Sequence, residues 1–254
     1  MENKRHSLNP GALTAPLPPA IITVGDLDRA NMLTVAWTGI LATVPPKTYI
    51  SVRPSRHSYG ILCEKQEFVI NLPSANMAKT VDFVGIYTGA KVDKFKKCAL
   101  TKLPSKEVSA PTVAECPIAL ECRVTDILKM GSHDVFIADI VSVSCKDEII
   151  DGEGKMHFEK ADLLAYAHGE YYALGERLGR FGFSTDKEPK AEKGKPKIEK
   201  HPPKNIEKNA EKSKIDGTAH RPFYESAPRS KSRPKKPADK NKGAPHGRNG
   251  GRKK

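Results

Sequence analysis

The stretch that decides the fold runs from Asn31 to Ser58 and reads NMLTVAWTGILATVPPKTYISVRPSRHS. It contains two apolar, β-branched runs, Leu33–Val44 and Thr48–Val52, which two prolines separate. Such runs predict strands, and Gly39 inside the first run indicates a bend or bulge in one long strand. The second predicted strand leads directly into a polar cluster.

This cluster, RPSRHS, holds two guanidiniums (Arg53 and Arg56), two hydroxyls (Ser55 and Ser58) and the imidazole of His57. Arginine offers forked, charge-assisted donors and serine adds short ones, so the residues predict a site for a phosphate or a carboxylate. A solvated turn whose arginines face water is the alternative that the residues alone leave open.

The rest of the first 185 residues alternates short strands with a few helices. Alternating apolar residues predict further strands, and a change of apolar face after Ile140 predicts a bulge. These strands are Ala20–Val24, Glu67–Leu72, a long one that starts at Ile118, and Asp134–Cys145. Short helical turns are predicted at Ser58–Lys65 and Asp93–Cys98. Helical spacing and capping residues predict a helix that follows Ser74 and ends at Gly85, and a closing helix that follows Asp162. The closing helix would bury Leu163, Leu164, Ala167, Tyr171 and Leu174.

Short connections favour antiparallel pairing, and no βαβ rhythm or GxGxxG motif indicates a dinucleotide fold. A mainly β domain with a few helices, closed into a small barrel, hides its sheet edges most economically. We therefore expect one domain over residues 1–185.

Charge separates this domain from the remainder of the chain. Residues 186–254 hold 22 Lys and Arg against 9 Asp and Glu, a net charge of +13 that equals the net charge of the whole chain. This Lys- and Pro-rich segment has few large apolar residues, so we expect a disordered basic tail. Such tails attract polyanions, and a nucleic acid or an acidic partner is a candidate ligand.

Several classes of protein find no support in the sequence. There is no N-terminal apolar signal and no apolar run long enough to cross a membrane. The five cysteines are odd in number, and no pair has CxxC spacing. We therefore expect a cytoplasmic protein with reduced thiols. Histidine spacing predicts no metal site, and no GxSxG motif indicates a nucleophile. Cys116 and Cys122 could be redox-active, but packing as buried thiols is the better-supported interpretation.

Four other polar or aromatic residues could line a ligand site: Asn31, Thr34, Trp37 and Asn71. Each has an ordinary structural role open to it as well. Thr34 is a strand former, Trp37 is the sole tryptophan and would pack in a core, and Asn71 ends a strand where asparagine often caps a turn.

Four stretches in order resemble the flavoredoxin branch of the flavin reductase-like family. They are NMLTVAW from Asn31, Pro45-Pro46 with YISVRPSRHS from Tyr49, FVINLP from Phe68, and YYALG with LGRFG from Tyr171 to Gly182. The resemblance covers about Pro10 to Ser184, and residues 186–254 have no counterpart in it.

The resemblance implies an FMN-binding split β-barrel with Greek-key-like antiparallel strands, usually a homodimer. Members pass electrons from NAD(P)H through FMN to free flavin, a ferric complex or a partner protein, so the protein is either an enzyme or an electron carrier. The resemblance also implies that the FMN phosphate binds the polar cluster at Arg53–Ser58 and that the isoalloxazine ring lies near Trp37. The implied FMN-binding residues are Asn31, Thr34, Val35, Ala36, Trp37, Ser51, Val52, Arg53, Ser55, Arg56, His57, Ser58, Asn71 and Leu72. A β-barrel whose tail binds a polyanion is the alternative function.

Overall fold

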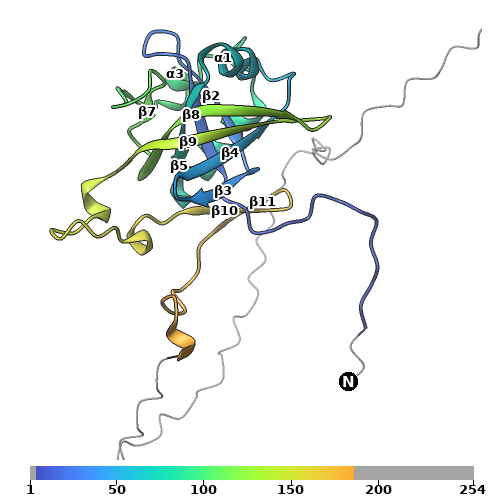
Figure 1. Cartoon of the computed structure of the whole chain (residues 1–254), viewed down its shortest axis with the longest axis vertical. Coiled ribbons are helices and arrows are strands. Elements are labelled where there is room, and N and C mark those ends of the chain that lie inside the picture. The colour runs from blue at the N-terminus through green and yellow to red at the C-terminus, as the bar shows by residue number, and fades with distance from the viewer. Residues whose placement is uncertain (1–3, 186–254) are drawn as a thin grey trace, which may run out of the picture. The chain divides into compact units, whose positions relative to one another are not determined.

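The computed structural model describes residues 4–185. Its centre is a seven-stranded sheet in the order β2-β1-β5-β8-β9-β4-β3, and all neighbouring strands in it are antiparallel (Figure 1). The predicted mainly β class is therefore confirmed. The strands are β1 (Ala20–Val24), β2 (Asn31–Val35), β3 (Thr38–Thr43), β4 (Pro46–Val52), β5 (Glu67–Leu72), β8 (Ile118–Lys129) and β9 (Asp134–Cys145).

The connection between β2 and β3 explains why the sheet curls. These strands are the two edges of the sheet, yet only Ala36 and Trp37 join them. Two residues cannot span an open sheet, so the edges must approach each other. The Ser51 backbone N–H donates to the Trp37 carbonyl at 2.9 Å and extends the β3–β4 pairing to Trp37. The prediction of one continuous strand over Leu33–Val44 is wrong, because the chain passes from one edge to the other at this point.

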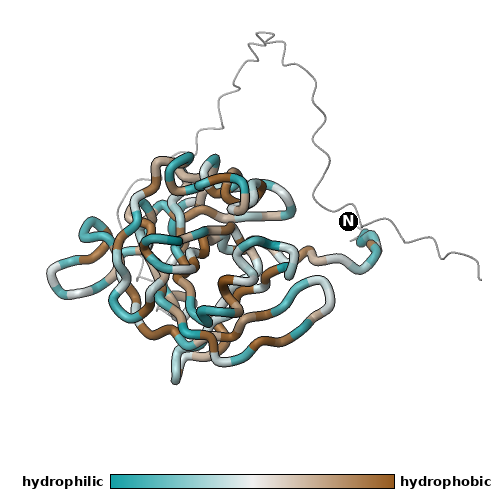
Figure 2. The backbone as a smooth tube through the Cα atoms, turned by 90° about the horizontal axis from the view of Figure 1, so that it is seen from above, coloured by the Kyte–Doolittle hydropathy of each residue, from teal (hydrophilic) through white to brown (hydrophobic). Residues whose placement is uncertain are grey.

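Apolar side chains from every strand fill the interior of the curled sheet. Ile22, Ile50, Phe68, Cys122 and Phe136 are fully buried there. Full burial of a large apolar side chain contributes about 1.5–3 kcal/mol, so this interior is the main source of stability. Figure 2, in which the backbone is coloured by residue hydropathy, shows hydrophobic residues concentrated along the segments inside the domain.

The β8–β9 hairpin contains the predicted bulge. Glu121 pairs with Ser142 and the next residue, Cys122, pairs with Ile140, so Val141 is the extra residue. The bulge reverses which side chains of β9 face inward and confirms the change of face expected after Ile140.

Helices cover one end and one outer face of the barrel. Helix α1 (His57–Lys65) is a full helix rather than the predicted turn, and its Leu62 is buried in the interior cluster. The segments η1 (Ala75–Met77), α2 (Ala78–Ile86) and α3 (Lys94–Cys98) pack on the outer face of β1 and β2. The helical turn predicted around Asp93–Cys98 is present as α3, and Asp93 caps it, because its carboxylate accepts from the Lys96 backbone N–H.

The predicted boundaries of α2 need correction. Ser74 Oγ bonds to the Asn76 side chain and caps no backbone N–H. Gly85 lies inside the helix and does not end it. A Cβ at Gly85 would lie 3.3 Å from Thr34 Cβ, so the glycine lets α2 approach β2 closely.

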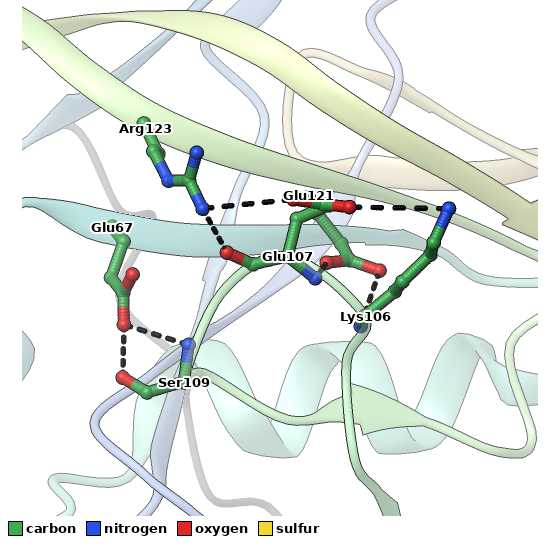
Figure 3. Close-up of polar contacts among 6 residues, drawn as sticks. All are labelled: Glu67, Lys106, Glu107, Ser109, Glu121 and Arg123. Atoms are coloured by element: carbon green, nitrogen blue, oxygen red, sulfur yellow. Dashed lines mark hydrogen bonds and ion pairs between the residues drawn. The ribbon is translucent and has the colours of Figure 1, made fainter.

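A loop between β6 (Lys102–Leu103) and β7 (Thr112–Val113) is fixed to the outer face of β5 and β8 (Figure 3). The buried Glu121 carboxylate accepts from the backbone N–H groups of Lys106 at 3.0 Å and Glu107 at 2.6 Å. Glu67 accepts from the backbone N–H and the hydroxyl of Ser109. These bonds add to the apolar packing of Val108 and Ala110, which are buried against Val69 and Ala119.

The closing helix predicted after Asp162 is wrong, because this segment forms an antiparallel hairpin of β10 (Leu164–Ala167) and β11 (Glu170–Ala173). His168 and Gly169 join the strands with φ values of 46° and 96°, the left-handed pair that a two-residue hairpin turn requires. Leu17, in the extended segment before β1, pairs with Tyr166 of β10.

Three short 3₁₀ segments complete the described part: η2 (Asp147–Ile149), η3 (Phe158–Lys160) and η4 (Phe183–Thr185). No helix within residues 4–185 has the length and apolar character needed to cross a membrane. The predicted tail lies outside the described residues.

Candidate anion and cofactor site

The predicted polar cluster forms the turn between β4 and α1. The Arg56 backbone N–H donates to the Arg53 carbonyl at 2.9 Å, which reverses the chain immediately before α1 begins at His57. Ser55 and Arg53 are exposed in this turn, and Arg56 is half-buried. The turn therefore places both arginines at the same end of the barrel.

Arg56 is held by the end of α2. Its Nη1 donates to the Gly85 carbonyl at 2.9 Å, in the last turn of that helix. Burial and the neighbouring positive charge of Arg53 lower the pKa of Arg56. No described carboxylate forms an ion pair with either arginine. Two close cations without a counter-ion make an environment that an anion would stabilise.

Asn31 and Ser58 meet beside the arginines. The Asn31 amide nitrogen donates to Ser58 Oγ at 2.7 Å, and both residues are buried. Because Ser58 accepts this bond, its own hydroxyl hydrogen remains available to a ligand. The pair also joins the first residue of β2 to the first turn of α1 and so fixes the two walls of the site.

Trp37 lies at the junction of β2 and β3 and contacts a residue that the sequence did not identify. Its ring meets the His133 ring edge-on, with centroids 4.6 Å apart and planes at 80°. Burial, followed by the positive charges of Arg53 and Arg56, lowers the pKa of His133, so this ring is neutral at pH 7. His133 thus joins the aromatic part of the site to the cationic part.

The remaining predicted site residues have other contacts. Thr34 donates its hydroxyl to the Val81 carbonyl at 2.6 Å. The Asn71 amide is completely buried, donates to the carbonyl of Ile21 and accepts from the Val113 backbone N–H, on the outer face of the sheet. The side chains of Val35, Val52 and Leu72 pack in the interior apolar cluster. Ala36 and Ser51 are half-buried and lie beside Trp37. His57 is exposed.

Sequence reasoning missed His133 and also Lys94, a buried lysine on α3. Both lie far along the chain from the cluster, and no local motif marks them. Only the curling of the sheet and the packing of α3 on β2 bring them near the arginines.

The structure does not support redox chemistry at Cys116 or Cys122. Burial raises the pKa values of Cys116 and Cys122 to about 12, so both remain protonated thiols at neutral pH. Within residues 4–185, no group of three or more His, Cys, Asp or Glu side chains is arranged to hold a metal ion.

The fold and site define a class: a small antiparallel barrel with a turn at one end that carries two arginines, Arg53 and Arg56, near the Trp37–His133 contact. The family profile described as "Flavin reductase like domain" matches residues 13–175. The chain belongs to the flavin reductase-like family.

Three relatives illustrate the similarity. Flavoredoxin of Desulfovibrio vulgaris (Miyazaki F) has a solved structure that is 31% identical, covers 72% of this chain and 100% of that chain, and superposes with a TM-score of 0.67. FMN reductase (NADH) RutF of Bradyrhizobium diazoefficiens is 23% identical over 51% of this chain and 71% of its own. NADPH-flavin oxidoreductase of Streptomyces viridifaciens is 25% identical over 56% of this chain and 70% of its own.

Proposed function

We propose that this protein binds FMN at the β4–α1 turn and uses it to carry electrons from NAD(P)H to an acceptor. The observation that carries the proposal is the pair Arg53 and Arg56, two close cations without a described carboxylate partner, next to the Trp37–His133 contact. Family membership and relatives named as an FMN reductase and a flavoredoxin support FMN as the cofactor.

The donor set fits a phosphomonoester. A phosphate of this kind carries about −1.5 to −2 charges at neutral pH and has three strong acceptor oxygens. Arg53, Arg56, Ser55 and the free hydroxyl hydrogen of Ser58 supply charged and neutral donors from one turn and the start of one helix. Trp37 would line the ring system together with the backbone of Ala36 and Ser51.

Bound FMN would supply the hydride and single-electron chemistry, and the residues of this chain bind and orient it. His133, which is neutral, adds no charge beside Trp37, so the positive field comes from the arginines. The absence of a predicted acid–base or nucleophilic motif agrees with this division of labour.

Purification of the full chain tests the proposal. Heat treatment should release a yellow compound that chromatography identifies as FMN, and anaerobic titration with NADH and NADPH should bleach its visible absorption. Reoxidation by free flavin, a ferric complex or a candidate partner protein then distinguishes a reductase from an electron carrier. A folded sample that neither contains nor takes up FMN contradicts the proposal.

We further propose a cytoplasmic homodimer, on the basis of the family resemblance. Sedimentation of the flavin-loaded protein tests the subunit number, because a dimer has twice the 27.8 kDa mass of the chain. A single species of monomer mass at micromolar concentration contradicts it.

A second candidate activity, binding of nucleic acid or an acidic partner, rests on the net charge of +13 in residues 186–254. This activity is compatible with the first, because a basic segment can localise a redox domain. RNA affinity should fall steeply as salt rises, and truncation after residue 185 should abolish that dependence. A flat salt response removes this candidate.

A further inference from the structure

Asp134 is a buried carboxylate that the site described above does not use. It is the first residue of β9 and is 5% exposed. The hydroxyl of Tyr59, on α1, donates to its Oδ2 at 2.5 Å, the length of a charge-assisted bond. No described basic side chain forms an ion pair with Asp134. Because burial of a carboxylate is costly and one neutral donor compensates it only in part, stability alone does not account for this residue.

The position of Asp134 links the separate parts of the candidate site. Its backbone pairs with Val52 of β4, and Arg53 directly follows Val52. Its neighbour in the chain is His133, whose ring contacts Trp37. Its side chain holds helix α1. One residue therefore adjoins the arginine turn, the aromatic contact and the helix that begins at the end of that turn.

Tyr59 is the other half of this link. It directly follows Ser58, whose hydroxyl accepts from Asn31 of β2, and its backbone N–H donates to the Arg56 carbonyl at 2.9 Å. The Tyr59 ring meets Phe136 of β9 edge-on, with centroids 5.7 Å apart and planes at 74°. The first turn of α1 is thus fixed to β2 through Ser58 and to β9 through Tyr59.

The hydroxyl of Tyr59 stays a donor under ordinary conditions. Its pKa is raised well above the usual value, first by the bond to Asp134 and then by a hydrogen bond with the Cys63 thiol. A charge-assisted bond from a rigid ring restricts geometry more than a bond between two neutral groups. The bond therefore acts as a firm connection between α1 and the start of β9.

We propose that Tyr59 and Asp134 are positioning residues, and that their bond sets the spacing between the arginine turn and the Trp37–His133 contact. The inference rests on the proposed FMN-binding function and deepens it by naming the residues that hold its two subsites apart. A ligand that carries an anion and a ring in one molecule gains affinity from a fixed spacing, because less freedom is lost on binding. A separate anion and a separate ring gain nothing from it.

The first test measures the affinity of the full flavin-free chain for FMN, riboflavin and inorganic phosphate. Tyr59→Phe removes the hydroxyl and keeps the ring beside Phe136. We expect FMN binding to weaken about 5- to 20-fold and the binding of riboflavin and phosphate to change by less than about twofold. Equal losses for FMN and riboflavin indicate general loosening and overturn the proposal, as does an unchanged FMN affinity.

Tyr172→Phe is the matched control. The Tyr172 hydroxyl also donates to a carboxylate, that of Glu170, but this pair is exposed on the β10–β11 hairpin. The substitution removes the same kind of bond outside the site. All three affinities should stay within about twofold of wild type, and a loss of FMN affinity as large as that of Tyr59→Phe would contradict a specific role for the Tyr59–Asp134 bond.

The second test separates the bond from the charge of Asp134. Asp134→Asn keeps an oxygen that can accept from Tyr59, whereas Asp134→Leu has no acceptor. We expect Asp134→Asn to bind FMN within about threefold of wild type and Asp134→Leu to lose as much as Tyr59→Phe. The double variant Tyr59→Phe/Asp134→Leu should lose no more than either single variant, because all three lack the same bond. If Asp134→Leu does not fold, Tyr59→Phe and Asp134→Asn still decide the question.

The outcomes distinguish this inference from the proposed function. A chain that fails to bind FMN at all contradicts both. A chain that prefers FMN to riboflavin, and keeps that preference after Tyr59→Phe, retains the function and loses the role of the bond. If Asp134→Asn loses as much FMN affinity as Tyr59→Phe, or if Tyr59→Phe weakens phosphate binding as much as FMN binding, the proposal is wrong.

Discussion

The Asn31 amide donates to Ser58 Oγ across 2.7 Å and joins residues 27 positions apart in the sequence. The bond connects the edge strand β2 to the helix that closes the end of the barrel. It also explains how two residues predicted separately for the site become a single structural unit, with one hydroxyl hydrogen left for a ligand.

Ser58→Ala should therefore destabilise the flavin-free protein. The change leaves a buried amide donor without its acceptor, and such a loss costs about 1–3 kcal/mol. Urea unfolding of the variant should show a lower midpoint with an unchanged slope. Ser55→Ala is the control: Ser55 is exposed in the same turn, and its change should have an effect within about 0.5 kcal/mol.

Gly89→Ala should disturb the same unit from the other side. A Cβ at Gly89 would lie 2.1 Å from Asn31 Oδ1, so the Asn31 side chain must leave Ser58. We expect a lower unfolding midpoint and weaker FMN binding. Gly60→Ala, in α1 with nothing within 4 Å of the added atom, should instead stabilise the protein by about 0.5–1 kcal/mol. A neutral Gly89→Ala would contradict the packing described here.

The loop fixed by Glu121 offers a test outside the site. Glu121→Ala removes the acceptor of the Lys106 and Glu107 backbone N–H groups, so we expect destabilisation of about 2–4 kcal/mol. Hydrogen exchange should show faster exchange of these two amides. Glu107→Ala, whose side chain makes only long ion pairs of 3.8 Å and 3.9 Å, should cost less than about 1 kcal/mol.

The loop after β9 should give stability a specific pH dependence. His157 contacts Asp151 at 2.8 Å and Glu159 at 3.0 Å through its two ring nitrogens, and carboxylates only accept, so both nitrogens donate and the ring is protonated. Its pKa is raised, first by Asp151 and then by Glu159. A raised folded-state pKa contributes stability below the ordinary pKa of 6.5, and this contribution is lost as pH rises through the folded value.

Urea unfolding at several pH values between 6 and 9 measures this contribution. Wild type should lose stability relative to His157→Gln as pH rises across that range. The two carboxylates titrate at more acidic pH because their own pKa values are lowered, so they do not obscure the effect. Parallel pH profiles for the two proteins would contradict protonation of His157.

The sequence predicted the strands well because alternation reports burial directly. It failed at Ala36 and Trp37, since continuous apolar character conceals a change from one sheet edge to the other. It failed again after Asp162, where the spacing of Leu163, Ala167 and Tyr171 fits a helix, and only the left-handed pair His168 and Gly169 distinguishes a hairpin.

The candidate site was predictable in part for a related reason. Arg53, Ser55, Arg56 and Ser58 are close in sequence, so a motif reveals them. His133 and Lys94 reach the same region through the β8–β9 hairpin and the packing of α3, and no local pattern encodes these distances.

The most direct measurement is the affinity of Arg53→Ala for FMN and for riboflavin, relative to wild type. If the turn holds the phosphate, the variant should lose about 10- to 150-fold in FMN affinity, which corresponds to one charge-assisted bond, and almost nothing for riboflavin. Equal losses for the two flavins, or an unchanged FMN affinity, would contradict an anion-binding role for this turn.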